Sequence, residues 1–294
     1  MTARREGGCC LRHGRADAAL RTHSLAAVAT RRRTETGGND LVTVEFGKEN
    51  RDAIVLLHGG GLSWWGYREA AQLLQTRFHV VLPVLDGHAG SDARFVSIER
   101  NAEELLAYID AHLDGRVLAV GGLSLGAQIA AEMLARRRDL CRYAVLESAL
   151  VFPMPAVRSM LRPAMDMAYG LIGRPWFSRL QFRSLNLNEA YYPDYFRDTR
   201  RIAKEDMLAF LTANADYAIK PALRLTSART LILVGGREQR NMLRSARALH
   251  ETIGHSSLRV LKGYTHGALS MNHAAEYAGL LMDWIEQTPP VGEP

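Results

Sequence analysis

The pentapeptide Gly122-Leu123-Ser124-Leu125-Gly126 has the residue types and spacing of a nucleophile elbow. The unbroken apolar run before it, residues 116–121, predicts a strand buried on both faces, and the helix formers of residues 127–138 predict a helix behind it. A serine at such a turn is exposed at a helix N-terminus, where it can act as a nucleophile. The alternative interpretation of Ser124 is an ordinary N-cap serine.

A serine hydroxyl needs a base to accept its proton before it can attack a carbonyl carbon. In a strand–turn–helix topology of this kind the expected order along the chain is serine, acid, histidine. Of the ten histidines, only His266 directly follows the last predicted strand, residues 258–262. We therefore predict His266 as the general base, since an isolated loop histidine would otherwise be inert at the surface.

The acid that would orient His266 has two candidates. Glu238 follows the predicted strand 230–234 and precedes His266 by one helix and one strand. Glu147 ends the strand after the elbow and also emerges at the carboxyl edge of the sheet, where a buried glutamate needs a partner. Glu238 is the leading candidate and Glu147 the alternative, while a helix N-terminal role for Glu238 is the simpler explanation of that residue.

A second glycine-rich turn, His58-Gly59-Gly60-Gly61, follows the predicted buried strand 53–57. Backbone N–H groups stabilise the oxyanion formed during acyl transfer, and we expect those of Gly60 and Leu125 to form this oxyanion hole. Three apolar residues that follow this turn are candidates for substrate binding. We expect one of the two tryptophans among them to pack in the core and the other to form a wall of the acyl pocket. The three residues are Leu62, Trp64 and Trp65.

Apolar runs alternate with helical patterns along most of the chain. Strands are expected at residues 41–46, 53–57, 78–85, 116–121, 143–147, 230–234 and 258–262, and helices at 67–75, 97–113, 127–138, 240–253 and 274–284. This alternation predicts an α/β fold with a doubly wound, mostly parallel sheet. The core would comprise residues 39–150 and 228–288, followed by a flexible tail at 289–294.

The alternation stops between residues 151 and 227. This segment holds six prolines, several methionines and many aromatic residues, which together predict short helices. Its simpler interpretation is an irregular surface insertion, and the functional one, which we favour, is a helical cap or lid over the elbow.

Composition bounds the remaining possibilities. The net charge of +6 resides in the first 33 residues, which hold eight arginines and two acidic residues, so no nucleic-acid partner is expected for the rest. Residues 1–38 lack a sustained apolar pattern and are expected to be a disordered Arg-rich extension, although a transit peptide or a nucleic-acid-binding arm has the same composition. No apolar run has the length of a membrane span.

Three cysteines, Cys9, Cys10 and Cys141, form neither a disulfide framework nor a metal site, which favours a reducing, cytoplasmic setting. No metal-ligand cluster or phosphate-binding glycine motif is present, so no cofactor is expected. The sequence does not indicate an oligomeric state.

Five motifs, in the order LLHGGGLSWW, LPVLDGHAGSD, GGLSLGAQ, LILVGGRE and GYTHG, resemble those of the α/β-hydrolase superfamily, in particular single-domain esterases and lactonases with a helical cap. The resemblance covers about residues 41–286 and implies Ser124 as nucleophile and His266 as its histidine. Glu238 stands where the family usually has aspartate, and His88, in a loop with Ala89 for a family glycine, is expected to be structural. Only one strand is visible before the HGGG turn, so a shortened first hairpin is expected.

These observations predict a serine hydrolase that cleaves a small or medium apolar ester or lactone through an acyl-enzyme on Ser124. Acyl transfer, haloperoxidase-like or lyase chemistry on the same residues is an alternative, because fold and triad do not fix the reaction. A non-catalytic receptor that binds a small molecule in the capped pocket is the alternative from another class.

Overall fold

Strand β5 (Val117–Leu123), which ends at Ser124, lies inside an eight-stranded sheet of strand order β1-β2-β4-β3-β5-β6-β7-β8. The computed structural model describes residues 30–36 and 39–287. Strands β4, β3, β5, β6, β7 and β8 run parallel to one another. Strand β2 pairs antiparallel with β4 on one side and with β1 on the other. The other strands are β1 (Thr30–Thr36), β2 (Asn39–Phe46), β3 (Ala53–Leu57), β4 (His79–Pro83), β6 (Cys141–Glu147), β7 (Arg229–Gly235) and β8 (Ser256–Leu261). The predicted fold class is confirmed.

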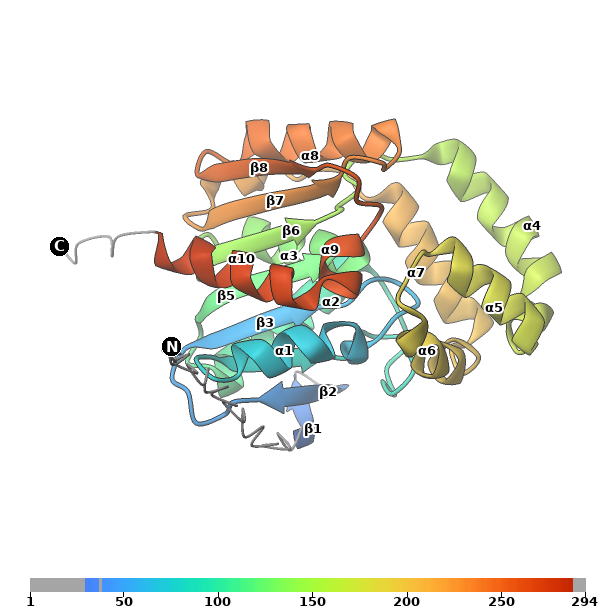
Figure 1. The fold of residues 1–294 in the computed structure, drawn as a ribbon, viewed down its shortest axis with the longest axis horizontal. Helices are drawn as coiled ribbons and strands as arrows, with labels where there is room; N and C mark the ends of the chain where they lie inside the picture. Colours follow the sequence, from blue (N-terminus) through green and yellow to red (C-terminus); the bar gives the residue numbers. More distant parts are fainter. Residues whose placement is uncertain (1–29, 37–38, 288–294) are drawn as a thin grey trace, which may run out of the picture.

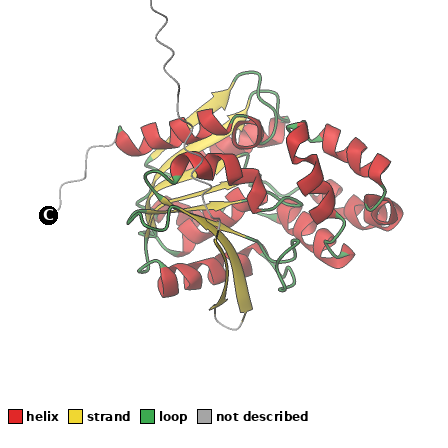
Figure 2. Ribbon diagram, turned by 60° about the horizontal axis from the view of Figure 1, so that its bottom comes forward, coloured by secondary structure: helices red, strands yellow, loops and turns green. Residues whose placement is uncertain are grey.

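Helices cover both faces of the sheet (Figures 1 and 2). Helices α1 (Arg68–Leu74), α9 (Ala268–Asn272) and α10 (Ala274–Glu286) cover one face, and α2 (Ile98–His112), α3 (Leu125–Arg136) and α8 (Arg240–Thr252) cover the other. Successive residues of the central strands alternate between the two apolar cores: Val55 and Leu57 face one, and Ile54 and Leu56 the other. Since both faces are buried, these strands are apolar without interruption, the pattern that predicted them.

The first hairpin is complete, contrary to expectation. Strand β1 pairs with β2 over seven residues, from Thr30 opposite Glu45 to Thr36 opposite Asn39. The extension predicted to be disordered through residue 38 therefore contains a strand at residues 30–36, and the expectations for residues 1–29 and for the tail at 289–294 fall outside the described residues. The sequence TRRRTET has no apolar run to reveal this strand, because its backbone hydrogen bonds depend on the neighbouring strand.

Between β6 and β7 the chain forms helices and no strand, as predicted. The helices are α4 (Pro155–Ile172), α5 (Pro175–Ser184), α6 (Tyr192–Thr199) and α7 (Lys204–Asp216), with short 3-10 turns at Glu189–Tyr191 and Pro221–Leu225. Figure 1 shows this helical insertion beyond the carboxyl ends of the parallel strands.

Buried polar contacts attach the insertion to the sheet layer. Gln128 of α3 donates from Nε2 to the carbonyl oxygens of Leu150 (2.7 Å) and Asn214 (3.0 Å), and Asn214 Nδ2 donates back to Gln128 Oε1 at 2.8 Å. Trp65 Nε1 donates to Asp198 Oδ2 on α6 at 2.9 Å. A buried polar group is costly without a partner, so these bonds fix where the insertion lies above the sheet.

The turn between β5 and α3 depends on two glycines. A Cβ on Gly126 would lie 2.1 Å from the carbonyl oxygen of Leu57, and one on Gly122 would lie 2.3 Å from the carbonyl carbon of Gly126. Both contacts are with backbone atoms, which cannot move aside as a flexible side chain can. Strand β3, the elbow and the start of α3 are thus in direct backbone contact.

We predict that Gly126→Ala destabilises the fold by about 3 kcal/mol or more, because the methyl group would force β3 and α3 apart. The matched control is Gly170→Ala in α4, where a Cβ meets nothing within 4 Å. That substitution should stabilise the protein by up to about 1 kcal/mol through backbone entropy. Urea denaturation of both variants measures the difference, and equal effects would contradict the packing argument.

Candidate active site

Ser124 has a left-handed backbone conformation, with φ 54° and ψ −113°. This region is strained for a residue with a Cβ, and such strain concentrates at functional sites. Its N–H donates to the carbonyl oxygen of Glu147 at 2.9 Å, while its side chain makes no capping hydrogen bond to α3. The N-cap alternative is therefore not supported, and the hydroxyl is left for another partner.

His266 and Glu238 are hydrogen-bonded to each other. His266 Nδ1 lies 2.7 Å from Glu238 Oε2, and the imidazole side chain is 48% exposed while the carboxylate is buried. A carboxylate can only accept, so Nδ1 carries the proton and Nε2 presents a lone pair. Nε2 is thus the nitrogen that can accept a proton from a nearby hydroxyl.

The buried carboxylate of Glu238 is satisfied by several donors. Oε1 accepts from the N–H of Gly235 at 2.6 Å and from Ser148 Oγ at 2.8 Å, in addition to the bond between Oε2 and His266. Burial alone would raise its pKa, but the bonds to His266, Gly235 and Ser148 outweigh burial and lower the pKa of Glu238 below its ordinary value. Glu238 is therefore ionised at neutral pH.

The loop that carries His266 packs on the end of the elbow strand. Gly267 is left-handed, at φ 66°, and a Cβ there would lie 2.8 Å from the side chain of Leu123, the residue before Ser124. The N–H of Gly267 also donates to Ser148 Oγ at 3.4 Å. The loops after β5, β6, β7 and β8 thus meet at one edge of the sheet, although within the described residues no hydrogen bond yet joins Ser124 Oγ to His266. Catalytic hydrogen bonds often tighten only when substrate binds.

Ser148 was not singled out from the sequence. It too has a left-handed backbone, at φ 55°, and its hydroxyl links Glu238 to the loop of His266. Its position directly after a buried strand was the available signal, because side chains at the carboxyl ends of parallel strands gather at one edge.

Glu147, the alternative acid, forms no hydrogen bond or ion pair with His266 within the described residues. Its side chain is 2% exposed, and Oε1 accepts from the N–H of Ser270 in α9 at 3.3 Å, while Oε2 has no hydrogen-bond partner among the described residues. Burial raises the pKa of Glu147 to about 7. The geometry favours Glu238 over Glu147 as the orienting acid, and Glu147 instead connects the end of β6 to α9.

The backbone N–H groups of Gly60 and Leu125 have no acceptor in the described part of the chain. These are the predicted oxyanion donors, and the residues are neighbours, since a Cβ on Gly60 would lie 3.6 Å from the side chain of Leu125. The same Cβ would lie 3.3 Å from the ring of Phe210 in α7, so the helical insertion reaches the glycine turn.

Two buried histidines hold the loop of Gly60 and Gly61 in place. His88 Nε2 accepts from the N–H of Gly61 at 3.0 Å, and His58 Nε2 accepts from the N–H of Leu85 at 3.1 Å. Burial lowers the pKa of His58 to about 3 and that of His88 to about 4, so both rings are neutral and can accept. His88 is structural, in agreement with expectation, and its ring stacks on Phe210 at 4.5 Å.

The three predicted substrate-binding residues differ in their surroundings. Trp65 is fully buried and donates to Asp198, so it is the tryptophan of the core. Leu62 is buried beside Gly59, and Trp64 is partly exposed. Of the two tryptophans, Trp64 is the one that remains available to a bound molecule.

The model of the "Alpha/beta hydrolase family" matches residues 54–280 of this sequence, more than three quarters of the chain. The chain belongs to the α/β-hydrolase family. The predicted membership, and with it the prediction of a hydrolase enzyme, is confirmed. No curated protein sequence matches this α/β-hydrolase.

Solved structures share its fold at low sequence identity. A thermophilic esterase from Thermogutta terrifontis superimposes with a TM-score of 0.70 at 19% identity, over 88% of this chain and 99% of the other. The enol-lactonase from Burkholderia xenovorans LB400 gives 0.72 at 16% identity, over 86% and 99%. An esterase from Exiguobacterium antarcticum gives 0.73 at 17% identity, over 88% and 99%.

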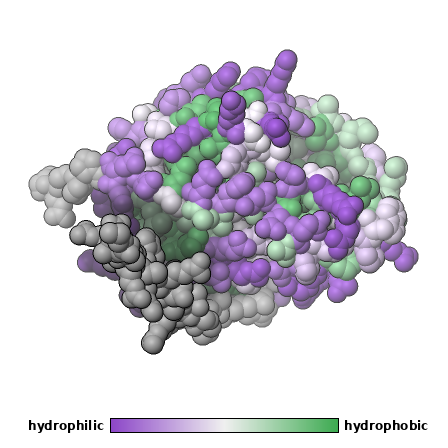
Figure 3. All heavy atoms as spheres, in the orientation of Figure 1, coloured by the Kyte–Doolittle hydropathy of each residue, from purple (hydrophilic) through white to green (hydrophobic). Residues whose placement is uncertain are grey.

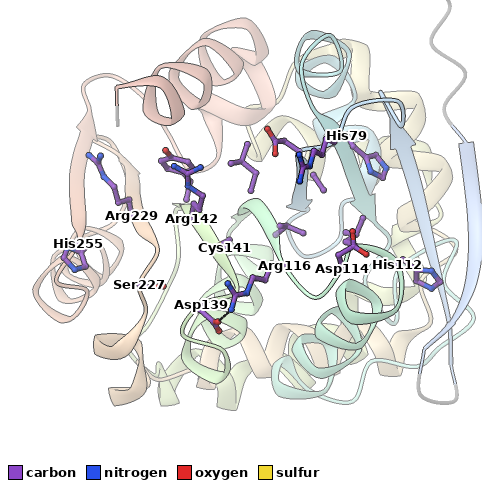
Figure 4. Close-up of a pocket in the computed structure, with 17 residues that line it drawn as sticks. His79, His112, Asp114, Arg116, Asp139, Cys141, Arg142, Ser227, Arg229 and His255 are labelled. Atoms are coloured by element: carbon purple, nitrogen blue, oxygen red, sulfur yellow. Dashed lines mark hydrogen bonds and ion pairs between the residues drawn. The ribbon is translucent and has the colours of Figure 1, made fainter. Parts of the chain in front are cut away.

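A cavity of about 900 Å³ lies at the opposite edge of the sheet of this α/β-hydrolase, away from Ser124 (Figure 4). It is lined by residues at the amino ends of the parallel strands, such as Asp52, Arg116 and Cys141. Arg116 forms an ion pair with Asp139 across part of it. Ligands of parallel α/β sheets bind at the carboxyl ends of the strands, so this cavity has no part in chemistry at Ser124.

The buried state of Glu147 predicts a pH dependence of stability. Between about pH 4.5 and about pH 7 the unfolded chain releases the proton of Glu147 while the folded protein retains it, so the free energy of unfolding falls as pH rises. Glu147→Gln keeps an acceptor for Ser270 but does not ionise. We predict that, over this pH range, the free energy of unfolding of the variant falls by on the order of 3 kcal/mol less than that of the wild type.

Urea denaturation at about pH 5 and about pH 8 measures this effect on the wild type and the variant. Glu251→Gln, at an exposed glutamate of α8, is the matched control and should leave the pH dependence as it is. A Glu147→Gln protein that keeps the wild-type pH dependence would show that Glu147 is ionised in the fold.

Proposed function

We propose that this α/β-hydrolase is a serine hydrolase that cleaves esters or lactones of small or medium apolar acyl compounds. The observation that carries the proposal is the 2.7 Å bond between His266 and Glu238, at the sheet edge that also carries a strained serine whose hydroxyl is not used for capping. Other chemistry on the same three residues has no specific observation in its favour.

In the first half-reaction, Ser124 Oγ attacks the carbonyl carbon of the substrate as its proton passes to His266 Nε2. The imidazolium that forms is stabilised by ionised Glu238, which accepts from Nδ1–H. The N–H groups of Gly60 and Leu125 donate to the developing oxyanion, an interaction that typically lowers the barrier by about 3 kcal/mol per donor. His266 then protonates the leaving alcohol, which leaves an acyl group on Ser124.

In the second half-reaction, water attacks the acyl carbon while His266 accepts a proton, and the carboxylic acid leaves as Ser124 recovers its hydroxyl hydrogen. Trp64 offers partly exposed apolar surface shortly after the glycine turn, which favours an apolar acyl group. The solved structures of similar fold include esterases and an enol-lactonase, which supports ester or lactone substrates.

A fluorophosphonate probe tests whether Ser124 is activated. We expect the wild-type protein to be labelled and Ser124→Ala to resist labelling, with hydrolysis of p-nitrophenyl esters reduced by roughly 10⁴-fold or more. Ser159→Ala, at an exposed serine of α4, is the matched control and should be labelled like the wild type. A folded wild-type protein that resists the probe, yet gains thermal stability from a small apolar ligand, would favour the receptor alternative.

Glu238→Gln tests the orienting acid. We expect it to lower kcat by roughly 10³–10⁴-fold, because the amide can donate to His266 Nδ1 and hold the imidazole in the wrong tautomer. Glu147→Gln, a matched substitution nearby, should change kcat little. Steady-state kinetics of both variants on a p-nitrophenyl ester decide the assignment, and the opposite ranking in two folded proteins would transfer the role to Glu147.

A further inference from the structure

Helix α4 presents an apolar stripe to solvent. Its members follow the helical spacing of three and four residues that places side chains on one face, and Met160 and Met167 are 64% and 82% exposed. The stripe comprises Val157, Met160, Ala164, Met167 and Leu171. Large apolar side chains exposed in a row are uncommon on a soluble surface and mark an interaction site.

The next helix extends the apolar surface. On α5, Trp176 is 63% exposed and Leu180 is 61% exposed, one helical turn apart. Helices α4 and α5 contact each other and lie at the end of the molecule away from both labelled termini (Figure 1). In Figure 3, green atoms gather at this end of the molecule, well separated from the grey segments.

The two helices that form the apolar surface carry a net positive charge. Residues 155–185 contain five arginines and one acidic residue, Asp166, which forms an ion pair with Lys204. Arg158 and Arg179 have carboxylate partners, in Asp216 and Glu189. Arg174 and Arg183 form no ion pair within the described residues, whereas Arg162 lies on the side of α4 opposite the stripe. The surface therefore combines exposed methionines and a tryptophan with unpaired guanidinium groups.

We propose that the face formed by α4 and α5 binds an anionic lipid surface. An amphipathic helix with apolar residues on one face and arginines beside them lies in the interface of a bilayer, with the guanidinium groups near the phosphates. Within residues 30–36 and 39–287, no helix has the length and apolarity needed to cross a membrane, so the contact is peripheral. A second copy of the chain is a poorer occupant, because it would bring the same positive charge against this one.

Docking in this way would bring the helical insertion, and the edge of the sheet that carries Ser124, close to the lipid surface. This follows from the position of the insertion beyond the carboxyl ends of the parallel strands. The proposal does not depend on the reaction catalysed at Ser124.

Vesicle co-sedimentation of the full chain tests the proposal. We expect binding to vesicles of phosphatidylcholine with phosphatidylglycerol to be about tenfold tighter than to phosphatidylcholine alone, and to weaken with added salt. The triple variant Met160→Ser, Met167→Ser, Trp176→Ser should lose binding by about tenfold or more. The matched control replaces three exposed apolar residues elsewhere, Leu73, Leu225 and Val260, by serine and should bind like the wild type.

A second variant isolates the charge. Replacing Arg174 and Arg183 by glutamine should remove most of the roughly tenfold preference for anionic vesicles and leave the weak binding to neutral vesicles unchanged. Thermal melts establish that each variant is folded.

Two results would overturn the proposal. One is vesicle binding that is absent, or is unaffected by the apolar triple variant; in the latter case other basic residues, such as those of the first 33, carry the attraction. The other is a concentration-dependent dimer in sedimentation velocity that the triple variant abolishes, together with no vesicle binding, which would make this face an interface between two copies.

Discussion

The left-handed backbone of Ser124 is the constraint on which the rest of the site depends. A residue with a Cβ is held in this conformation only when its surroundings leave no alternative. Here the N–H of Ser124 donates to the carbonyl oxygen of Glu147 in β6. On the other side of β5, Gly126 packs against the carbonyl oxygen of Leu57 in β3. The central strands therefore determine the direction in which the hydroxyl points.

Electrostatics then separates the roles of two glutamates that lie near one another. Glu238 is surrounded by donors, which favour its ionised form, whereas Glu147 accepts from Ser270 and its burial raises its pKa to about 7. One carboxyl group can thus orient an imidazole, while the other, which keeps its proton up to about pH 7, connects β6 to α9. The two buried histidines also depend on their neutral state, because only a neutral ring lets His88 accept from the N–H of Gly61 and His58 accept from the N–H of Leu85.

Much of the fold could be predicted because its central strands are buried on both faces and are therefore apolar throughout. Strand β1 could not, since an arginine-rich segment becomes a strand only through its hydrogen bonds to β2. The helical insertion was recognisable from its prolines and the loss of alternation. The exposure of the row that contains Met160 and Met167 could not be predicted, because the same apolar spacing also describes a buried helix.

For the site, the sequence by itself determined the nucleophile motif, the order of serine, acid and histidine, and the family, because these depend on local residue types and on their succession along the chain. Only the tertiary structure supplied the hydrogen bond between Glu238 and His266, placed Trp65 in the core and revealed Ser148. The physical reason is that hydrogen bonds and burial between loops far apart in sequence are set by how the strands align, and both glutamates follow neighbouring strands of the same sheet.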